Sequence, residues 1–448
     1  MKNNTLNTNS SNKHFTFLNL FKKNHFMMQS IKIMILRVIG VITLFGFTLF
    51  LTKTYDPKII GQYDFIRTYL LILGSICVLG TDQSILYFTG MLKSRNRSGE
   101  LKRIYIKMFF LIFLMSLLCL ILILIIGNET VSFYFNDFKI YGVILKATFL
   151  LFFYCITIFN TETLRALESI YIAELFRNTF KYLSVIIGSI ILFYIQEQTY
   201  LAETFLIGFF FLSIISTIKI FSVFNKKEKE NSPESRDEIS YRFIFLKSYP
   251  IAISTMAIFL LMSFDVMFLK KFKGNEEVAF YALAVKLMTL LLVVMNSVNI
   301  TISPKIAEQF FSEKREELKK TMRSSSRMIF FISIPLVLFF CFFSEMILGF
   351  FGEKYLVAKE PLIILMIGQG ICSFFGAVQV YLNMTGRQTT FQVILIFAVI
   401  INFVLNKTLI PIYGMSGAAF SYAVSMFLWN LAATIIIYKK DKIAVFLT

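Results

Sequence analysis

The chain has 448 residues, of which 57% are hydrophobic and only 16% are charged, against about 25% charged residues in an ordinary soluble domain. So few charges cannot coat a water-soluble globule of this size, and the apolar content excludes a disordered chain. We therefore expect a polytopic, all-α membrane protein. The net charge of +18 does not indicate nucleic-acid binding, because the Lys and Arg residues fall mostly into short polar gaps between apolar runs.

The cysteines and histidines give no sign of a metal site or a disulfide framework. The five cysteines are scattered, and each lies inside an apolar run. His14 and His25 have no Cys, Asp or Glu at ligand spacing beside them. We expect no cofactor, no metal and no catalytic residue.

The first apolar run, Ile31 to Thr52, is long enough to cross a bilayer and too long for a cleavable signal peptide. We therefore expect residues 1–30 to form a basic cytoplasmic tail. A hydropathy scan with a window of about 19 residues predicts twelve spans: Ile31 to Thr52, Ile66 to Gly90, Ile104 to Ile126, Ile140 to Thr163, Tyr171 to Ile195, Thr204 to Phe224, Ile244 to Leu269, Val278 to Ile302, Met328 to Phe351, Leu356 to Leu382, Phe391 to Ile412 and Gly414 to Tyr438.

Lys and Arg in the gaps predict the orientation. The gaps after the second, sixth and eighth spans are strongly basic and must lie on one face, because even numbers of spans separate them. With twelve spans, both termini fall on that same, cytoplasmic face. One basic group lies on the opposite face and disagrees with this rule: Lys270, Lys271 and Lys273.

A weak internal repeat divides the predicted spans into two halves. Gly61 to Tyr63 opens the second span as Ala279 to Tyr281 opens the eighth, 218 positions later. Because each half has six spans, both halves must have the same orientation, as in a parallel repeat. We therefore expect an N-terminal lobe over 31–224, a cytoplasmic linker over 225–243, a C-terminal lobe over 244–438 and a cytoplasmic tail over 439–448.

Three stretches carry a family resemblance: LIPIYGMSGAAFSYAVS from Leu409 to Ser425, YLNMTGR from Tyr381 to Arg387, and the segment from Asp265 to Leu287. They resemble the polysaccharide transporters, or O-antigen (Wzx-like) flippases, of the MOP superfamily; Ala279 departs from the Gly that such proteins commonly carry there. The resemblance implies a MATE-like, two-lobed flippase that moves an undecaprenyl-diphosphate-linked oligosaccharide from the cytoplasmic to the periplasmic leaflet of the bacterial inner membrane. The implied partners are this lipid-linked substrate, membrane lipids and other membrane proteins of polysaccharide assembly.

A flippase must shelter an anionic head group, so cations inside the predicted spans are candidate substrate ligands. Arg37 and Lys286 lie deepest, in opposite halves, and we expect a cleft between the lobes to present both to one diphosphate. Arg67 and Lys146 are further candidates. Both lie within about two helical turns of a span end, so snorkelling to the membrane interface is an equally good explanation.

Buried carboxylates are candidates for a coupling ion or for structural ion pairs. Asp82 lies in a polar island inside the second span, which indicates either a cation site on a broken helix or a packing patch. Asp265 is either a coupling group or a partner of nearby Lys270. Glu162 is expected to pair with Arg165 at the end of the fourth span.

Two other classes of membrane protein compete with a flippase. A MATE-type drug and cation antiporter has the same architecture, but it needs acidic cavity walls. A polysaccharide polymerase needs a long periplasmic loop for its chemistry, whereas every predicted periplasmic gap here is short. The sequence therefore favours a transporter over an enzyme.

Overall fold

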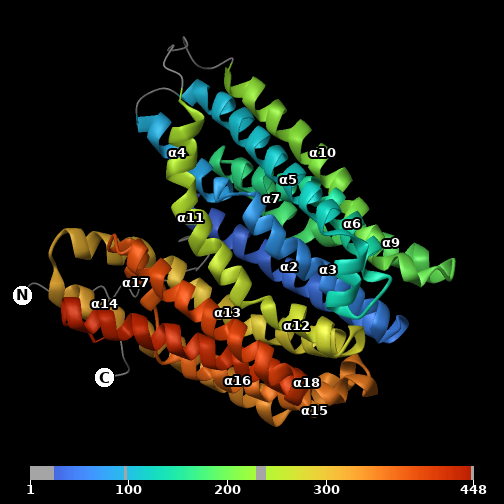
Figure 1. Cartoon of the computed structure of the whole chain (residues 1–448). Coiled ribbons are helices and arrows are strands. Elements are labelled where there is room, and N and C mark those ends of the chain that lie inside the picture. Colours follow the sequence, from blue (N-terminus) through green and yellow to red (C-terminus); the bar gives the residue numbers. More distant parts are fainter. Residues whose placement is uncertain (1–24, 95–97, 229–238, 445–448) are drawn as a thin grey trace, which may run out of the picture.

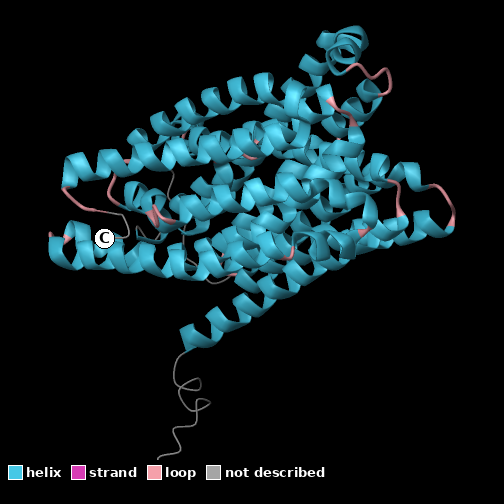
Figure 2. Ribbon diagram, turned by 90° about the horizontal axis from the view of Figure 1, so that it is seen from below, coloured by secondary structure: helices cyan, strands magenta, loops and turns pink. Residues whose placement is uncertain are grey.

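The computed structural model describes residues 25–94, 98–228 and 239–444, and these are helical nearly throughout (Figures 1 and 2). The predicted tail up to Asn24 and most of the predicted linker lie outside the described residues. The first half of the chain forms the elements that we call the N-lobe: α2 (His25–Thr54), α3 (Pro57–Cys77), α4 (Thr81–Ser94), η1 (Ser98–Glu100), α5 (Leu101–Phe135), α6 (Ile140–Phe149), α7 (Leu151–Ala166), α8 (Ile170–Leu175), η2 (Phe176–Phe180), α9 (Lys181–Tyr194), η3 (Gln198–Tyr200) and α10 (Leu201–Glu228).

The second half forms a second bundle, the C-lobe, which Figure 1 shows in yellow to red beside the blue and green N-lobe. Its first helix, α11, packs against α18 of its own lobe and also against α3 and α4 of the N-lobe. The C-lobe elements are α11 (Tyr241–Leu261), α12 (Phe264–Phe272), α13 (Asn275–Phe311), α14 (Arg315–Phe342), α15 (Ser344–Phe351), η4 (Glu353–Ala358), α16 (Lys359–Ser373), α17 (Val378–Met384) and α18 (Gln388–Asp441).

The described helices account for the twelve predicted spans. Nine helices are long and apolar enough to cross a membrane, and two bent pairs, α3 with α4 and α6 with α7, bring the number to 11. The twelfth comes from α18, whose 54 residues would form a straight helix of about 80 Å, far longer than the roughly 30 Å of a bilayer core. The predicted all-α, twelve-span fold class is thereby confirmed.

The chain reverses within α18 at Gly414, where φ is 55° and ψ is −130°. Asn402 Nδ2 donates a hydrogen bond to the Ser421 carbonyl oxygen at 3.4 Å, although 19 residues separate them. A straight helix would place these residues about 28 Å apart, so α18 is an antiparallel hairpin. Its turn lies at the predicted boundary between the last two spans.

The second span begins at Pro57 rather than at the predicted Ile66. Asp56 caps the helix by accepting a hydrogen bond from the Lys58 backbone N–H at 2.8 Å, and Pro57 fits the first helical position because it has no N–H to satisfy. Lys58 and Asp64 lower the hydropathy of this first part, so the scan missed it. The correction brings Asp64 into the span.

We call the end of the bundle at which α2 begins the inner end, and the end at which α2 meets α3 the outer end. The helices α7 and α13 both finish at the inner end. The contact surface between the lobes, which we call the seam, is formed largely by α3 against α13. Large apolar side chains are exposed on outward faces, as on α5 and α14, where a membrane protein meets lipid.

Candidate functional site

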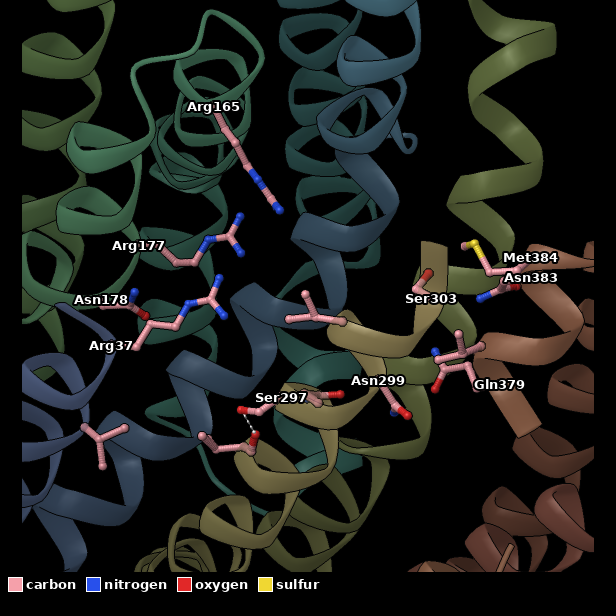
Figure 3. A pocket seen from close by; sticks show the side chains of 15 residues that line it. Arg37, Arg165, Arg177, Asn178, Ser297, Asn299, Ser303, Gln379, Asn383 and Met384 are labelled. Carbon is pink, nitrogen blue, oxygen red and sulfur yellow. Dashed lines mark hydrogen bonds between the residues drawn. The ribbon is translucent and has the colours of Figure 1, made fainter. Parts of the chain in front are cut away.

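A cavity of about 490 Å³ lies between the lobes toward the inner end (Figure 3). This volume is within the roughly 300–1,000 Å³ of typical ligand pockets. The N-lobe contributes Arg37, Val41, Arg165, Arg177 and Asn178, and the C-lobe contributes Val293, Asn296, Ser297, Asn299, Ile300, Ser303, Gln379, Val380, Asn383 and Met384.

The N-lobe wall is cationic. Arg37 comes from α2, Arg165 from the end of α7 and Arg177 from η2, and Figure 3 shows the three guanidinium groups on one side of the cavity. Between 35% and 42% of each side chain is exposed, so the N–H groups remain available to a ligand. No acidic side chain is among the described residues that line this cavity.

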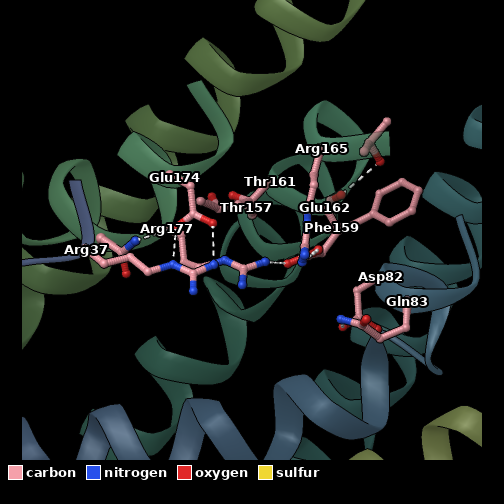
Figure 4. A network of polar contacts seen from close by, with 12 residues as sticks. Arg37, Asp82, Gln83, Thr157, Phe159, Thr161, Glu162, Arg165, Glu174 and Arg177 are labelled. Carbon is pink, nitrogen blue, oxygen red and sulfur yellow. Dashed lines mark hydrogen bonds and ion pairs between the residues drawn. The ribbon is translucent and has the colours of Figure 1, made fainter. Parts of the chain in front are cut away.

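Two buried glutamates behind this wall hold the arginines in place (Figure 4). Arg37 donates two hydrogen bonds to Glu174, at 3.0 and 3.3 Å, and Asn178 Nδ2 donates a third at 2.8 Å. Arg177 pairs with Glu162, and Arg165 lies 3.6 Å from the same carboxylate. Because each buried carboxylate has a cationic partner, neither is left as an isolated charge in the bilayer.

A π-helical turn sets the direction of two of these side chains. The span predicted over Tyr171 to Ile195 contains the five-residue turn Phe176–Phe180, which carries Arg177 and Asn178. A π turn adds a residue to the helical repeat and shifts the faces on either side of it, and such turns often occur at functional sites. Here Arg177 and Asn178 line the cavity, and Asn178 also contacts Glu174 (Figure 3).

The C-lobe wall is uncharged and polar. Four amide side chains line it, Asn296, Asn299, Gln379 and Asn383, together with the hydroxyls of Ser297 and Ser303. The amide oxygen of Asn299 is buried and has no hydrogen-bond partner in the described protein. An unpaired buried acceptor is costly, so this atom is suited to a donor supplied by a ligand or by water.

Lys286 does not share this cavity with Arg37. It precedes Ser297 by 11 residues on α13, about 16 Å toward the outer end. Lys286 Nζ lies 2.8 Å from Asp64 Oδ2 on α3, and both side chains are buried. Arg67 lies 3.4 Å from the other oxygen of Asp64. In this conformation, the cleft that would present Arg37 and Lys286 to one head group is therefore not formed.

Lys146 also lies away from the cavity. Its side chain is 56% exposed, and Nζ is 2.9 Å from Glu203 at the start of α10. This position near a helix end, with a partly exposed partner, is the one that snorkelling to the interface predicts.

The carboxylate candidates occupy three different settings. Asp82 lies in the first turn of α4, directly after the break at Leu79 and Gly80, and accepts a hydrogen bond from Gln83 Nε2 at 3.2 Å. Glu162 belongs to the arginine wall. Asp265 is buried in the C-lobe, where it accepts a hydrogen bond from the Tyr281 hydroxyl at 2.5 Å.

The alternative pairing of Asp265 with Lys270 is wrong. The two residues are five positions apart on α12, which places them about 140° apart around the helix. Lys270 instead crosses the seam to Asp137 Oδ2 at 2.7 Å.

Sequence reasoning missed Arg177 and Asp64 as site residues and assigned Arg165 only a structural role. Arg177 lies six residues inside its predicted span, as far in as Arg37 lies in the first, so the rule that selected Arg37 would also have found it. Asp64 was outside the predicted span because the start of α3 was placed too late. Arg165 gave no such signal, because it lies at the end of α7.

The outer end is closed by contacts across the seam. Lys58 pairs with Glu276 at 3.6 Å and Lys270 with Asp137 at 2.7 Å. Burial alone would raise the pKa of Asp137, but the hydrogen bond and charge of Lys270 outweigh it and hold the pKa below its usual value. A Cβ atom on Gly61 would lie 1.7 Å from the Asn275 carbonyl oxygen, so the two backbones meet only because residue 61 is glycine. The cavity thus lies toward the inner end, while these contacts close the outer end.

Comparisons with known proteins agree with this architecture. A family model described as "Polysaccharide biosynthesis protein" matches residues 33–310, and a model described as MatE matches residues 250–408. No curated protein matches the sequence significantly.

Solved structures with a similar fold include a lipid flippase and a multidrug transporter. Lipid II flippase MurJ, in an inward closed conformation, has a TM-score of 0.70 and 14% identity over 92% of this chain and 87% of that chain. An inward-facing multidrug resistance MATE family transporter of the MOP superfamily has a TM-score of 0.69 and 14% identity over 90% of this chain and 96% of that chain.

These findings confirm the predicted resemblance. The matches to solved structures are low in identity and establish the fold, whereas the polysaccharide biosynthesis model covers more than half of the sequence. The chain therefore belongs to the polysaccharide biosynthesis protein family and has a MATE-like fold.

Proposed function

We propose that the chain is a flippase that moves an undecaprenyl-diphosphate-linked oligosaccharide, the unit of an O-antigen or similar surface polysaccharide, from the cytoplasmic to the periplasmic leaflet of a bacterial inner membrane. The observation that carries the proposal is the arginine wall of the cavity between the lobes. Planar guanidinium groups form paired hydrogen bonds with phosphate oxygens, and three of them line one wall.

The two walls of the cavity suit the two parts of such a head group. The diphosphate is anionic and fits the wall of Arg37, Arg165 and Arg177, whereas sugar hydroxyls fit the amide wall. The unpaired Asn299 oxygen can accept a hydrogen bond from a hydroxyl. The inner end, where the cavity lies, is then the cytoplasmic face on which the lipid-linked unit is loaded.

Transport then requires the lobes to alternate. Opening the outer end must break the buried pair of Asp64 and Lys286 and the two ion pairs nearer the surface. Asp82 and Asp265 remain our candidates for a coupling proton or sodium ion, because both carboxylates are buried and neither has a cationic partner in the described ion pairs.

A MATE-type cation antiporter is the second candidate, and the match of the MatE model to residues 250–408 favours it. The charge of the cavity opposes it, because three arginines line one wall against two carboxylates behind them, and this net positive charge disfavours a cationic drug.

Reconstituted protein distinguishes the two candidates. Vesicles that contain a fluorescent undecaprenyl-diphosphate oligosaccharide should show flipping between leaflets, measured as protection from a membrane-impermeant quencher. Arg177→Gln should slow flipping about 10- to 100-fold, because a hydrogen bond to a charged group contributes roughly 1.5–3 kcal/mol. Arg177→Lys keeps the charge without the planar fork and should be intermediate.

Lys320→Gln is the matched control, because Lys320 is exposed on α14 outside the cavity, and its flipping rate should equal that of the unmodified protein. Accumulation of a cationic dye in the same vesicles, with no movement of the lipid, would instead establish the antiporter.

A further inference from the structure

The concentration of Lys and Arg in cytoplasmic loops does not explain the basic group at the outer end. Lys270, Lys271 and Lys273 lie at the junction of α12 and α13, on the face opposite to the basic gaps. Lys and Arg are concentrated in cytoplasmic loops of membrane proteins, so a basic cluster on the opposite face points to another role.

These lysines surround a second cavity, of about 440 Å³, that crosses the seam. The N-lobe contributes Lys58 and the segment from Phe135 to Asp137, and the C-lobe contributes the segment from Lys270 to Glu276. The cavity therefore exists only while the two lobes are in contact at the outer end.

The charges of this cavity are unequal. Four lysines line it against two carboxylates, Asp137 and Glu276, which leaves a net charge of +2 among the described lining residues. Lys270 and Lys58 are held by these carboxylates, at 2.7 and 3.6 Å. Lys271 has no carboxylate partner among the described ion pairs and lies 3.6 Å above the centre of the Tyr134 ring. Lys273 is exposed.

We propose that this cavity is an anion site that binds the phosphate group of a membrane lipid at the outer surface. Lys271 provides a cation that no described ion pair neutralises, Lys273 adds an exposed cation that interacts with Glu277, and the volume fits a lipid head group. A bound phosphate competes with Asp137 and Glu276 for Lys270 and Lys58, and so weakens two of the contacts that seal the seam. The phosphate belongs either to delivered cargo or to a bilayer phospholipid, and the chemistry of recognition is the same for both.

Titration of inorganic diphosphate into the full-length protein in phosphatidylcholine nanodiscs tests the site by calorimetry. The double variant Lys271→Gln with Lys273→Gln should weaken one class of binding site at least tenfold and leave the arginine cavity unchanged. Arg177→Gln should do the reverse, so a failure of the proposed function and a failure of this inference give different results. Lys354→Gln, an exposed outer lysine on η4 that does not line the cavity, is the control and should bind as the unmodified protein does.

Nanodiscs that contain phosphatidylglycerol identify the source of the phosphate. Competition by this anionic lipid at the lysine site would assign the site to bilayer phospholipid, and undiminished diphosphate binding would assign it to delivered cargo. The proposal is overturned if the double variant binds diphosphate as the unmodified protein does in both kinds of nanodisc, or if Lys354→Gln weakens binding equally.

Discussion

Asp64 forms a buried ion pair with Lys286 across the seam and also lies 3.4 Å from Arg67. Asp64→Leu alone leaves Lys286 without its carboxylate and should lower the free energy of unfolding by about 3–5 kcal/mol, whereas Lys286→Met leaves Asp64 beside Arg67 and should cost less. The double variant should regain part of the loss, because only Arg67 then loses its partner. Thermal unfolding in detergent measures both effects.

The same variants separate stability from transport. If the lobes must part at this pair, a permanent apolar contact should hold the outer end closed, and the double variant should be stable but slow in flipping. A double variant that flips at the normal rate would show that the pair is structural only.

Asp137 gives the outer closure a defined pH dependence. Its pKa is lowered in the folded protein, chiefly because Lys270 outweighs the effect of burial, so this contribution is complete above the ordinary aspartate pKa of about 3.9 and is lost only as the pH falls through the lower folded value. Hydrogen exchange of the segment from Asn275 to Tyr281 should consequently not change between about pH 5 and 8, after correction for the intrinsic rate. Opening within that range would assign control of the closure to another group.

The residues of the site were only partly predictable from sequence. A cation inside an apolar run is visible in a hydropathy scan, which is why Arg37 could be selected. Its partner Glu174 is 137 positions away, and nothing in the local pattern connects the two. The distance between Lys286 and Arg37 likewise depends on the heights of α13 and α2 relative to each other along the seam, which the sequence of neither helix determines.

At the scale of elements, the span pattern was predictable because hydropathy records burial in lipid directly. The ends of the spans were predicted correctly where a glycine breaks the helix. The third span was predicted to end at Ile126, and the helix is broken at Gly127; the last two spans divide at Gly414. The start of α3 was missed because its charged residues lower its hydropathy. These charges are neutralised by partners on α13, which the hydropathy of α3 alone cannot reveal.

The close approach of α3 and α13 at Gly61 can be tested by adding a methyl group there. Gly61→Ala places a methyl group where the Asn275 carbonyl oxygen lies, so the outer end should fail to close as it does here. We expect hydrogen exchange of residues 275–281 to rise at least tenfold and flipping to fall.

Gly46→Ala is the matched control, because no atom lies within 4 Å of its added Cβ and helix propensity favours Ala by up to about 1 kcal/mol. Equal hydrogen exchange of residues 275–281 in the two variants would show that the seam accommodates the methyl group and stays closed.

At the scale of the whole molecule, the two lobes are expected to move as rigid bodies. The present tilt between the lobes leaves a cavity at the inner end and brings three ion pairs together at the outer end. A tilt that opens the outer end should therefore close the inner end. The cavity then delivers its contents to the opposite face without ever forming a continuous channel.

Pairs of spin labels test this reciprocity by the distance between them. Lys139 and Lys354 are exposed near the outer end on opposite lobes, and Lys219 and Lys320 are exposed toward the inner end. Addition of the lipid-linked oligosaccharide together with an ion gradient should lengthen the outer distance and shorten the inner distance in the same sample. The double variant Asp64→Leu with Lys286→Met should retain the short outer distance. A change at one end without the other would exclude rigid alternation, because lobes that tilt about the seam cannot move at only one end.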